Sequence, residues 1–574
     1  MKRALSFILF LVACADMHAQ LSTNEKPVSF QLEGRELTVT KELMSSITMP
    51  ALDMEKIEEE DKEDEGYDMP PRFGYSHKVN YDLTNSGTWY DLPNGDKIWQ
   101  LNVVCPGALS VNFSYDKFWI PEGGKFFVFS KDRKHSIGAF TSRNNKGDKE
   151  NVRGFATGLV YGNDVVLEYY QPKDVMSDAL ISIEYVVHGY RYVNWREDGF
   201  GSSGSCQVNV NCVEGQDWQN EKNAVAMIVV NNNRVCTGAL INVTDLSQKP
   251  YLLTANHCLK VWDNNSLSYI KFDADTLPNL DNFTFYWNYE TPGCDNINIE
   301  PTFYSTSGAI VVANNSYSDF ALLRLTEDPS ELIGYTPYYL GWDHSGESGN
   351  PGVCIHHPRG DVKKISTVAN QPISTYHLDY IESSSASHWK VTWKLTPTRH
   401  GVTEYGSSGS PLLNSGHKVI GQLHGGDSRC DYPNDPDWFA KFNESWTGHG
   451  NDSIQRRMNC WLDSLNTGVQ TMEGLLVIPS ARTLTSDEQL YSNILIKNSG
   501  QLTIQSEVEL MGNSRVIVES GGKLIIDGGT LSNVDLVLKP GSSLEIVNGG
   551  IIETRNRFKA PVGASVDIVH GKIM

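Results

Sequence analysis

The chain has 574 residues, with 69 acidic and 48 basic side chains and a formal net charge of −21. This length exceeds what one hydrophobic core supports, so several domains are expected. The acidic balance argues against a nucleic-acid partner, because phosphate binding needs a basic face. Hydrophobic residues at 40% and charged residues at 20% are typical of a globular chain rather than a disordered one.

The first residues have the pattern of a secretory signal. Two basic residues precede an apolar run over residues 4–13, which is too short to span a bilayer as an anchor. Cleavage after Ala19 would remove residues 1–19. Alternatively, the sequence that ends at Cys14 resembles a bacterial lipobox, and lipid on this cysteine would hold the protein at a cell surface. Either route predicts export, where cysteines form disulfides rather than metal thiolates.

Two segments precede the region that carries the chemistry. Residues 20–69 end in the acidic run 58–65, which is typical of a solvated, flexible linker. Residues 70–200 alternate short apolar strands, such as 97–103 and 164–170, with glycine and asparagine turns. Strands at this spacing predict a β-sandwich, which we interpret as a pro-region.

The C-terminal part is a repeat. Residues 201–463 are again β-rich with longer loops, whereas residues 464–574 repeat a turn glycine followed by a short aliphatic strand. The apolar anchors of successive coils are Leu502, Leu524, Leu544 and Val566. This period predicts a β-solenoid, in which stacked coils bury a face that one coil cannot bury alone. A spacer is favoured over a surface-attachment or carbohydrate-binding role, because exposed aromatics and clustered acids are lacking.

Three motifs between residues 201 and 463 have the residue types needed for acyl transfer. His257 follows a strand and precedes a cysteine, Asp319 opens an apolar strand, and Ser408 lies in a Gly-Ser-Ser-Gly-Ser-Pro loop. Each motif alone also fits an ordinary histidine, turn aspartate or glycine-rich loop. Their order and context predict a base, an orienting carboxylate and a nucleophile.

The loop around the nucleophile also predicts an oxyanion hole. Glycines permit a tight turn that presents the Ser408 hydroxyl, and the backbone N–H groups of Gly406 and Ser408 can point at a developing oxyanion. The strand 418–426 that follows is typical of a substrate-binding edge strand.

Residues 201–450 resemble lysyl endopeptidase, the lysine-specific family of chymotrypsin-like serine proteases. The matching stretches are 201–206, 236–238, 286–289, 355–358, 406–411, 421–426 and 445–448. The resemblance implies an all-β, chymotrypsin-like double β-barrel that hydrolyses protein or peptide substrates without a cofactor or metal. The family carries the histidine pair at 356–357 without metal. We expect a monomer.

The resemblance also implies a disulfide pairing. The pairs are Cys206–Cys430, Cys212–Cys294 and Cys236–Cys258. Three further cysteines, Cys105, Cys354 and Cys460, lie outside this scheme. Their odd number leaves at least one thiol unpaired if Cys14 is removed with the signal.

Substrate-binding residues follow from the same resemblance. The family places an aspartate at the floor of its lysine pocket nine residues before a tryptophan, and Asp437 lies nine residues before Trp446. His424 matches the histidine of the binding strand, with Gly425 beside it. The family stacks an aromatic ring on this histidine, and Tyr380 and Trp389 are the candidates here. The alternative interpretation of Asp437, together with Asp431 and Asp435, is an ordinary acidic loop.

Activation departs from the trypsin pattern. Ser407, rather than an aspartate, precedes the nucleophile, so a new N-terminus has no carboxylate there to pair with. The N-terminal region is therefore expected to block the site or to assist folding. The basic residue near the junction is Arg196, with no lysine just before Gly201. We expect another protease to remove residues 20–200.

Together these features predict a secreted serine endopeptidase, made as a zymogen, that cleaves on the carboxyl side of lysine. The alternatives are a protease of mixed arginine and lysine specificity and a catalytically silent surface binding protein on a protease fold. The three triad residues argue against the silent protein.

Overall fold

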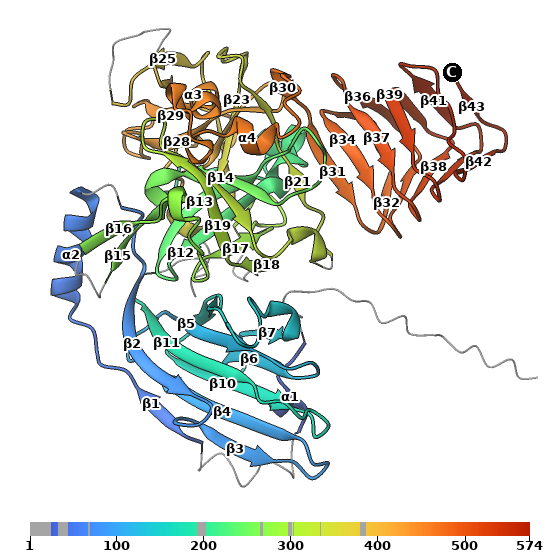
Figure 1. Ribbon diagram of the computed structural model, residues 1–574. Coiled ribbons are helices and arrows are strands. Elements are labelled where there is room, and N and C mark those ends of the chain that lie inside the picture. Colours follow the sequence, from blue (N-terminus) through green and yellow to red (C-terminus); the bar gives the residue numbers. More distant parts are fainter. Residues whose placement is uncertain are drawn as a thin grey trace, which may run out of the picture.

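The computed structural model describes residues 25–32, 44–66, 69–191, 203–263, 268–296, 301, 303–332, 334–378 and 386–574. Three β units follow one another: a sandwich, a double barrel and a solenoid (Figure 1). The predicted signal peptide, Cys14, Arg196 and Tyr380 lie outside the described residues. Within the described ranges, no helix is both long and apolar enough to cross a membrane.

The N-terminal unit consists of two facing sheets. The first contains β1 (Ser46–Thr48), β3 (Thr88–Asp91), β4 (Lys97–Val104), β6 (Lys125–Ser130), β7 (Ser136–Phe140) and β10 (Asp164–Gln171). The second contains β2 (Gly74–Asp82), β5 (Ser110–Trp119), β8 (Phe155–Ala156), β9 (Val160–Tyr161) and β11 (Leu180–Gly189). Side chains of both sheets, including Trp99 and Phe113, share one buried core. The predicted β-sandwich is confirmed.

The acidic segment before the sandwich is not the expected solvated linker. Helix α1 (Val28–Gln31) lies against the first sheet, where Phe30 packs on Phe129. The acidic run lies in helix α2 (Met54–Gly66). Three carboxylates of α2 bind arginines: Glu60 and Asp61 bind Arg72, and Asp64 binds Arg234. The linker prediction was wrong because these arginines lie outside the run.

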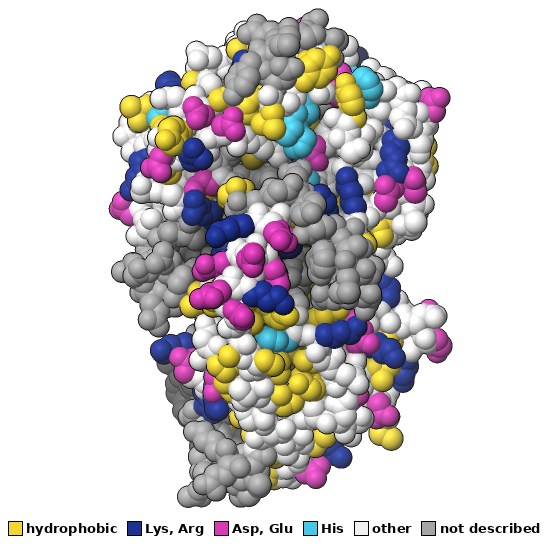
Figure 2. Space-filling view, turned by 90° about the vertical axis from the view of Figure 1, so that its left-hand side faces the viewer, with side chains coloured by type: hydrophobic (Ala, Val, Ile, Leu, Met, Phe, Trp, Pro, Cys, Tyr) yellow, Lys and Arg dark blue, Asp and Glu magenta, His cyan; other side chains and the backbone are white. Residues whose placement is uncertain are grey.

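The ion pairs of α2 connect the sandwich to the first barrel. Asp61 binds Arg72 at 2.8 Å and Asp64 binds Arg234 at 2.5 Å. Figure 2, which faces the side on which α2 lies, shows acidic side chains gathered beside basic ones in the band between the two units. The helix therefore fastens the sandwich to the first barrel.

The first barrel is formed by one antiparallel sheet of seven strands. Its order is β18 (Tyr304–Ser307), β17 (Thr284–Trp287), β12 (Val225–Val230), β13 (Arg234–Leu240), β14 (Tyr251–Ala255), β20 (Phe320–Leu325) and β19 (Ala309–Asn315). The ribbon β15 (Lys260–Asp263) and β16 (Ser268–Lys271) extends from it. The strands β12 and β13 are buried along their whole length, as expected for a barrel covered on its outer side.

The second barrel is formed by a separate sheet. Its path is β24 (Lys364–Thr367), β23 (Pro351–His356), β27 (Pro411–Asn414), β28 (Lys418–Gly426), β29 (Asp437–Lys441), β26 (His388–Val391) and β25 (Ile373–Thr375). The strand β22 (Gly341–Asp343) pairs with β28, and β30 (Thr471–Met472) pairs with β22. The helices α3 (Phe442–Thr447) and α4 (Asn459–Leu462) follow β29. The predicted double β-barrel is confirmed.

The solenoid stacks parallel strands on three faces. One face contains β31 (Gly474–Ile478), β34 (Ser492–Ile496), β37 (Arg515–Val518) and β39 (Thr530–Leu538). The second contains β32 (Ala481–Leu484), β35 (Gln501–Ile504), β38 (Lys523–Asp527), β40 (Ser543–Val547) and β42 (Ser565–Ile568). The third contains β33 (Glu488–Leu490), β36 (Glu507–Leu510), the start of β39, β41 (Ile551–Thr554) and β43 (Lys572–Ile573).

The predicted repeat register is confirmed. Leu502 pairs with Leu524, Leu524 with Leu544, and Leu544 with Val566 in neighbouring coils. The solenoid joins the barrels through β21 (Tyr338–Tyr339), which pairs with β31. One apolar core runs from the barrels into the coils. The solenoid therefore packs directly against the barrels and is not joined to them by a linker alone.

Candidate active site

The structure brings His257 and Asp319 into direct contact. His257 lies in a short turn after β14, and Asp319 immediately precedes β20, which pairs with β14. Nδ1 of His257 lies 2.8 Å from one carboxylate oxygen of Asp319, and the backbone N–H of His257 donates to the other oxygen at 2.9 Å. Both side chains are buried. This arrangement fixes the imidazole so that its other nitrogen faces away from the carboxylate.

Asp319 is held in a costly conformation. Its φ is 45°, in the left-handed region that non-glycine residues seldom adopt. Burial alone would raise the pKa of its carboxyl, but the charges of His424 and His257 and the bonds from His257 hold the pKa well below its ordinary value. The carboxylate therefore stays ionised. The donor atoms of these three residues lie within 4.8 Å of one another, so a cation could bind there only by displacing the proton between His257 and Asp319.

In the loop that carries Ser408, some backbone N–H groups donate hydrogen bonds to backbone carbonyls and others do not. The N–H groups of Ser407, Gly409 and Ser410 donate to backbone carbonyls at 2.9, 2.9 and 3.0 Å. Among the described residues, the N–H groups of Gly406 and Ser408 have no such acceptor. Gly406 has a φ of 87°, which a side chain would strain. Two amides of one loop thus have no backbone carbonyl as acceptor within the described part of the chain.

The loop that carries Ser408 packs against the strands that lead to His257. The carbonyl of Ser408 accepts a hydrogen bond of 2.9 Å from the N–H of Thr237, on β13. A Cβ at Gly409 would collide with Thr254 and with the backbone of β13 and β14. Because β14 ends two residues before His257, this contact sets the loop beside the histidine.

Three disulfides fasten these elements. The bonded pairs are Cys206–Cys430, Cys212–Cys294 and Cys236–Cys258, the pairs that the family resemblance implies. The last pair ties β13 to the turn that carries His257. The other described cysteines, Cys105, Cys354 and Cys460, are free thiols, the first two of them buried.

The buried hydroxyl of Ser407 lies directly before Ser408 in the sequence. Oγ of Ser407 lies 2.7 Å from Nδ1 of His356, whose Nε2 lies 3.1 Å from Oγ of Ser366. Burial lowers the pKa of His356 to about 3, so the ring is neutral. His356, one of the two adjacent histidines noted in the sequence, thus supports the loop that carries Ser408. The sequence alone did not indicate this role.

His424 lies in a row of histidine rings. The ring of His377 stacks on it with centroids 3.6 Å apart, and Nε2 of His388 lies 3.0 Å from its Nδ1. Nε2 of His424 lies 3.6 Å from the Asp319 carboxylate. The stacking partner is therefore His377, which was not among the sequence candidates. Trp389 instead donates to a β28 carbonyl and packs against Lys441.

Asp437 begins β29 and is fully buried behind the glycines of β28. One of its oxygens, Oδ2, accepts hydrogen bonds from Trp393, Thr403 and the Ser428 hydroxyl at 2.6, 2.7 and 2.6 Å. Its Oδ1 accepts one bond of 3.0 Å, from the Ser428 N–H. A Cβ at Gly426 would collide with Oδ1. Only glycine at this position leaves that oxygen approachable. The neighbouring Asp431 is exposed, as expected of an acidic loop.

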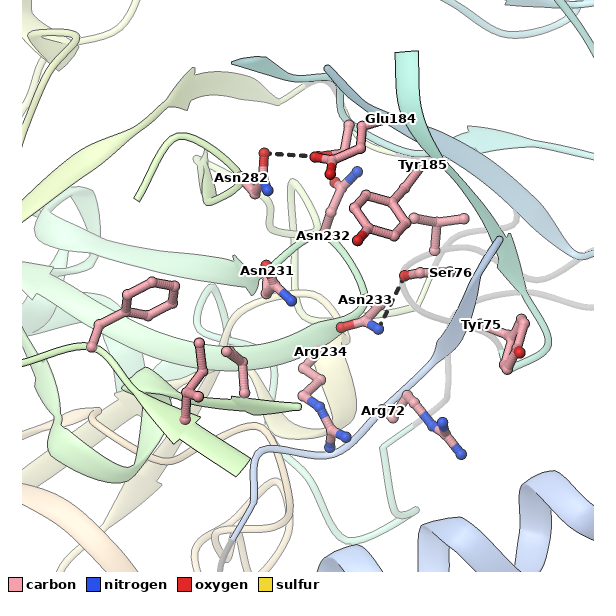
Figure 3. Close-up of a pocket in the computed structure, with 15 residues that line it drawn as sticks. Arg72, Tyr75, Ser76, Glu184, Tyr185, Asn231, Asn232, Asn233, Arg234 and Asn282 are labelled. Atoms are coloured by element: carbon pink, nitrogen blue, oxygen red, sulfur yellow. Dashed lines mark hydrogen bonds between the residues drawn. The ribbon is translucent and has the colours of Figure 1, made fainter. Parts of the chain in front are cut away.

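A large cavity lies away from these residues, between the sandwich and the first barrel. It has a volume of about 270 Å³ and is lined by polar side chains that include Ser76, Glu184 and Asn231 to Asn233 (Figure 3). Nδ2 of Asn233 donates to Oγ of Ser76 across it at 3.2 Å. The sandwich therefore docks through a polar seam on the outer side of the first barrel. In Figure 1 this seam lies on the opposite side of the protease domain from β28 and β29.

Comparison with known proteins identifies the relatives of this region. Residues 200–440 match the family model described as lysyl endopeptidase, C-terminal domain. A lysyl endopeptidase of Pseudomonas aeruginosa is 27% identical over 314 residues, which are 50% of this chain and 61% of that protein. The chain thus spans about three fifths of the length of this curated relative. The resemblance noted in the sequence is confirmed for this region.

Three solved structures align more loosely. The inactive form of the protease Rv3671c of M. tuberculosis is 15% identical over 38% of this chain and 84% of its own, with a TM-score of 0.23. A Glu endopeptidase in complex with MPD is 16% identical over 42% and 92%, with a TM-score of 0.23. The HtrA-type protease AlgW with a tripeptide is 13% identical over 42% and 64%, with a TM-score of 0.25.

Proposed function

We propose that this chain, which resembles lysyl endopeptidase over residues 200–440, is a serine endopeptidase that cleaves after lysine. The observation that carries the proposal is the buried His257–Asp319 pair beside a serine loop with two open amides. A base, its orienting carboxylate, a hydroxyl and an oxyanion site are the parts that acyl transfer needs.

In this mechanism, Oγ of Ser408 attacks the carbonyl carbon of the substrate and His257 accepts its proton. The N–H groups of Gly406 and Ser408 bind the oxyanion of the tetrahedral intermediate. His257 then protonates the leaving amine, which gives an acyl-enzyme, and water attacks the ester by the same route. Asp319 holds the tautomer of His257 and stabilises the imidazolium that forms.

The hydrogen bonds of Asp437 favour lysine over arginine. Its Oδ2 already accepts three hydrogen bonds, so a bidentate guanidinium would have to displace one of them. An ammonium is a point charge that needs only Oδ1. His424 and Gly425 line the approach on β28, with the His377 ring stacked behind His424.

Export of the protein is part of the proposal. The predicted signal at residues 1–19 and the three disulfides in the protease domain both favour an oxidising compartment. N-terminal sequencing and intact mass of the secreted protein would distinguish cleavage after Ala19 from lipid on Cys14.

The function is tested by peptide mapping of a digested, denatured proteome with the processed enzyme and its Ser408→Ala variant. We expect cuts after lysine that the variant loses, with kcat/KM lower by about 10⁶. Cuts after both lysine and arginine would retain the mechanism and refute the lysine pocket. An enzyme that cuts nothing and does not react with a fluorophosphonate would indicate the silent binding protein.

The lysine pocket has its own pH signature. Burial raises the pKa of Asp437, although Ser428, Thr403 and Trp393 donate to its carboxylate. As the pH falls through this raised pKa, the carboxylate is protonated and loses its attraction for an ammonium. We expect the Kd of an alkylamine inhibitor to rise up to tenfold per pH unit below that point. A Kd that stays flat from neutral pH down to the ordinary range of an aspartate would contradict the assignment of Asp437.

A further inference from the structure

The loop that carries the proposed oxyanion hole needs an anchor. In trypsin-type enzymes a carboxylate next to the nucleophile pairs with the new N-terminus, and here Ser407 occupies that position. The structure contains another carboxylate close by. Glu404 lies four residues before Ser408, and its side chain is only 5% exposed.

The carboxylate of Glu404 binds the start of the protease domain. Its Oε2 accepts hydrogen bonds from the backbone N–H of Gly204 at 2.8 Å and from Nε2 of Gln207 at 2.9 Å. Its Oε1 accepts one from Nε of Arg359 at 2.9 Å. Charge-assisted hydrogen bonds of this kind are stronger than neutral ones. Glu404 therefore joins three segments that are far apart in the sequence.

The backbone of Glu404 is part of the same loop as the open amides. Its carbonyl accepts the N–H of Ser407 at 2.9 Å, and its own N–H donates to the Ser407 hydroxyl at 3.2 Å. The N–H of Arg359 donates to the carbonyl of Tyr405. Only Tyr405 separates Glu404 from Gly406, so a shift of the Glu404 carboxylate would pass to the oxyanion amides through one intervening residue.

A second contact holds the domain start to the segment beneath Gly406. Oδ2 of the buried Asp361 accepts hydrogen bonds from the N–H and the hydroxyl of Ser203. A Cβ at Gly406 would approach the backbone of residues 357–360 to 3.0–3.2 Å, so this segment packs tightly under it. The residues that open the described protease domain are thus fixed on both sides of the oxyanion loop.

We propose that Glu404 is the positioning residue that couples the start of the protease domain to the oxyanion loop, in place of the missing aspartate before the nucleophile. The proposal rests on the proposed serine endopeptidase function. It assigns the coupling to a carboxylate inside the catalytic domain. The sandwich, which docks on the outer side of the first barrel, takes no part in it.

The test separates oxyanion binding from lysine binding. A peptidyl lysine aldehyde forms a hemiacetal with Ser408 and needs the oxyanion amides, whereas an alkylamine needs only the lysine pocket. In Glu404→Ala we expect the inhibition constant of the aldehyde to rise and kcat to fall by about 10- to 100-fold. The Kd of the alkylamine and KM should stay within about twofold, because Asp437 does not contact Glu404.

Two further variants serve as controls. Glu404→Gln retains a side-chain oxygen for the Gly204 N–H and should recover aldehyde binding to within about fivefold of the wild type. Glu214→Ala removes two comparable hydrogen bonds, to the N–H and hydroxyl of Thr398 at 3.1 and 2.9 Å, without touching residues 404–408. It should lower the melting temperature to a similar extent and leave aldehyde binding unchanged.

Several outcomes would overturn the proposal. The first is a folded Glu404→Ala that binds the aldehyde as tightly as the wild type. The second is an equal weakening of aldehyde and alkylamine binding in Glu404→Ala. The third is a Glu214→Ala variant that loses aldehyde binding relative to alkylamine binding to the same extent. If Glu404→Ala does not fold, Glu404→Asp, whose shorter side chain withdraws from Gly204, is tested in its place by the same comparison of aldehyde and alkylamine binding. A folded, processed wild-type enzyme that neither cleaves nor binds the aldehyde would refute the proposed function itself. If the wild type and Glu404→Ala both cleave and bind the aldehyde equally well, only the role of Glu404 is refuted.

Discussion

The double barrel carries a β unit on each side, and the two attachments are formed by different interactions. The sandwich docks through ion pairs such as Arg234–Asp64, through amide contacts such as Asn112–Asn232, and around a polar cavity. The solenoid instead continues the strand pairing of the barrels, from β21 to β31, and shares their apolar core. A small apolar cluster that includes Phe73 also crosses the sandwich seam.

The contrast suggests which unit can separate from the barrels once the chain between them is cleaved. A seam with polar side chains around a cavity resembles a transient interface between proteins, because its surfaces are compatible with water once they separate. A shared apolar core resembles the interior of one domain, and separating it would expose large aliphatic surface. We therefore expect the sandwich to be removable after cleavage and the solenoid to stay.

The largest expected effect follows from weakening the solenoid junction. Leu476 is 1% exposed and pairs with Tyr338 where the solenoid meets the barrels. Leu476→Ala, made in a Ser408→Ala background to prevent self-digestion, should lower the free energy of unfolding by about 3–5 kcal/mol. Calorimetry should show the barrels and the first coils melting together at a lower temperature.

The control for this variant is the same substitution in a distant coil. Leu544 is fully buried but lies away from the barrels. Leu544→Ala should destabilise the solenoid and leave the transition of the barrels in place. If Leu476→Ala behaved in the same way, the shared core would not couple the two units.

The next effect concerns the seam. Arg234 is 3% exposed and donates both to Asp64 and to the carbonyl of Pro70. Arg234→Met removes the buried ion pair with Asp64 and the hydrogen bond to the Pro70 carbonyl, which should favour local opening of the seam by about 2–3 kcal/mol. Hydrogen exchange of the full chain should report this at the N–H groups of Phe73 and Val235, which bond across the seam.

Arg324 provides a matched control on the same barrel, because its side chain is exposed on β20. Arg324→Met should leave exchange at the seam unchanged. Equal protection of Phe73 and Val235 in the Arg234→Met and wild-type chains would mean that the seam is held by its apolar cluster instead.

The two attachments also differ in what the sequence could predict. The solenoid register followed from one period, because each coil repeats the contacts of the last and its anchors recur at fixed spacing. The burial of Asp61 and Asp64 could not be inferred, because Arg72 and Arg234 are brought to α2 only by folding. An acidic run carries no sign of distant basic partners.

The same distinction holds within the candidate site. The motifs around His257, Asp319 and Ser408 are local, so the sequence predicts them. His377 was missed because a tyrosine or tryptophan was sought in a segment of altered length, although a histidine ring stacks as well. The bonds of Glu404 were invisible because Gly204 and Gln207 lie about 200 residues away.

A smaller effect should appear as a pH dependence of the seam. Burial raises the pKa of Glu327, although the charge of Lys146 opposes the shift, and Asn144 of the sandwich donates to its carboxylate. In the docked state this group binds a proton at a pH where an undocked glutamate would be ionised. Docking should therefore tighten severalfold as the pH falls from neutral and level off below the ordinary range of a glutamate.

Protection factors of the seam amides, measured at pH 7 and pH 5, check this sign. The increase in protection at pH 5 should shrink in Glu327→Gln, which cannot ionise. Glu184, which lines the seam cavity and whose pKa burial also raises, should supply the remainder. Looser docking at pH 5 in the wild type would show that the ion pairs of α2, rather than Glu327 and Glu184, dominate the pH dependence.

The smallest effect is expected at the exposed edge of the seam. Arg143 lies 3.4 Å from Glu331, and their side chains are 38% and 51% exposed. Water and salt screen such a pair, and holding two long side chains together costs entropy, so it contributes about 0.2–1 kcal/mol. Arg143→Ala should therefore change seam exchange less than fivefold, and added salt should remove the difference. An effect as large as that of Arg234→Met would mean that the whole seam, including its rim, is shielded from water, and the seam would then resemble the solenoid junction rather than a separable interface.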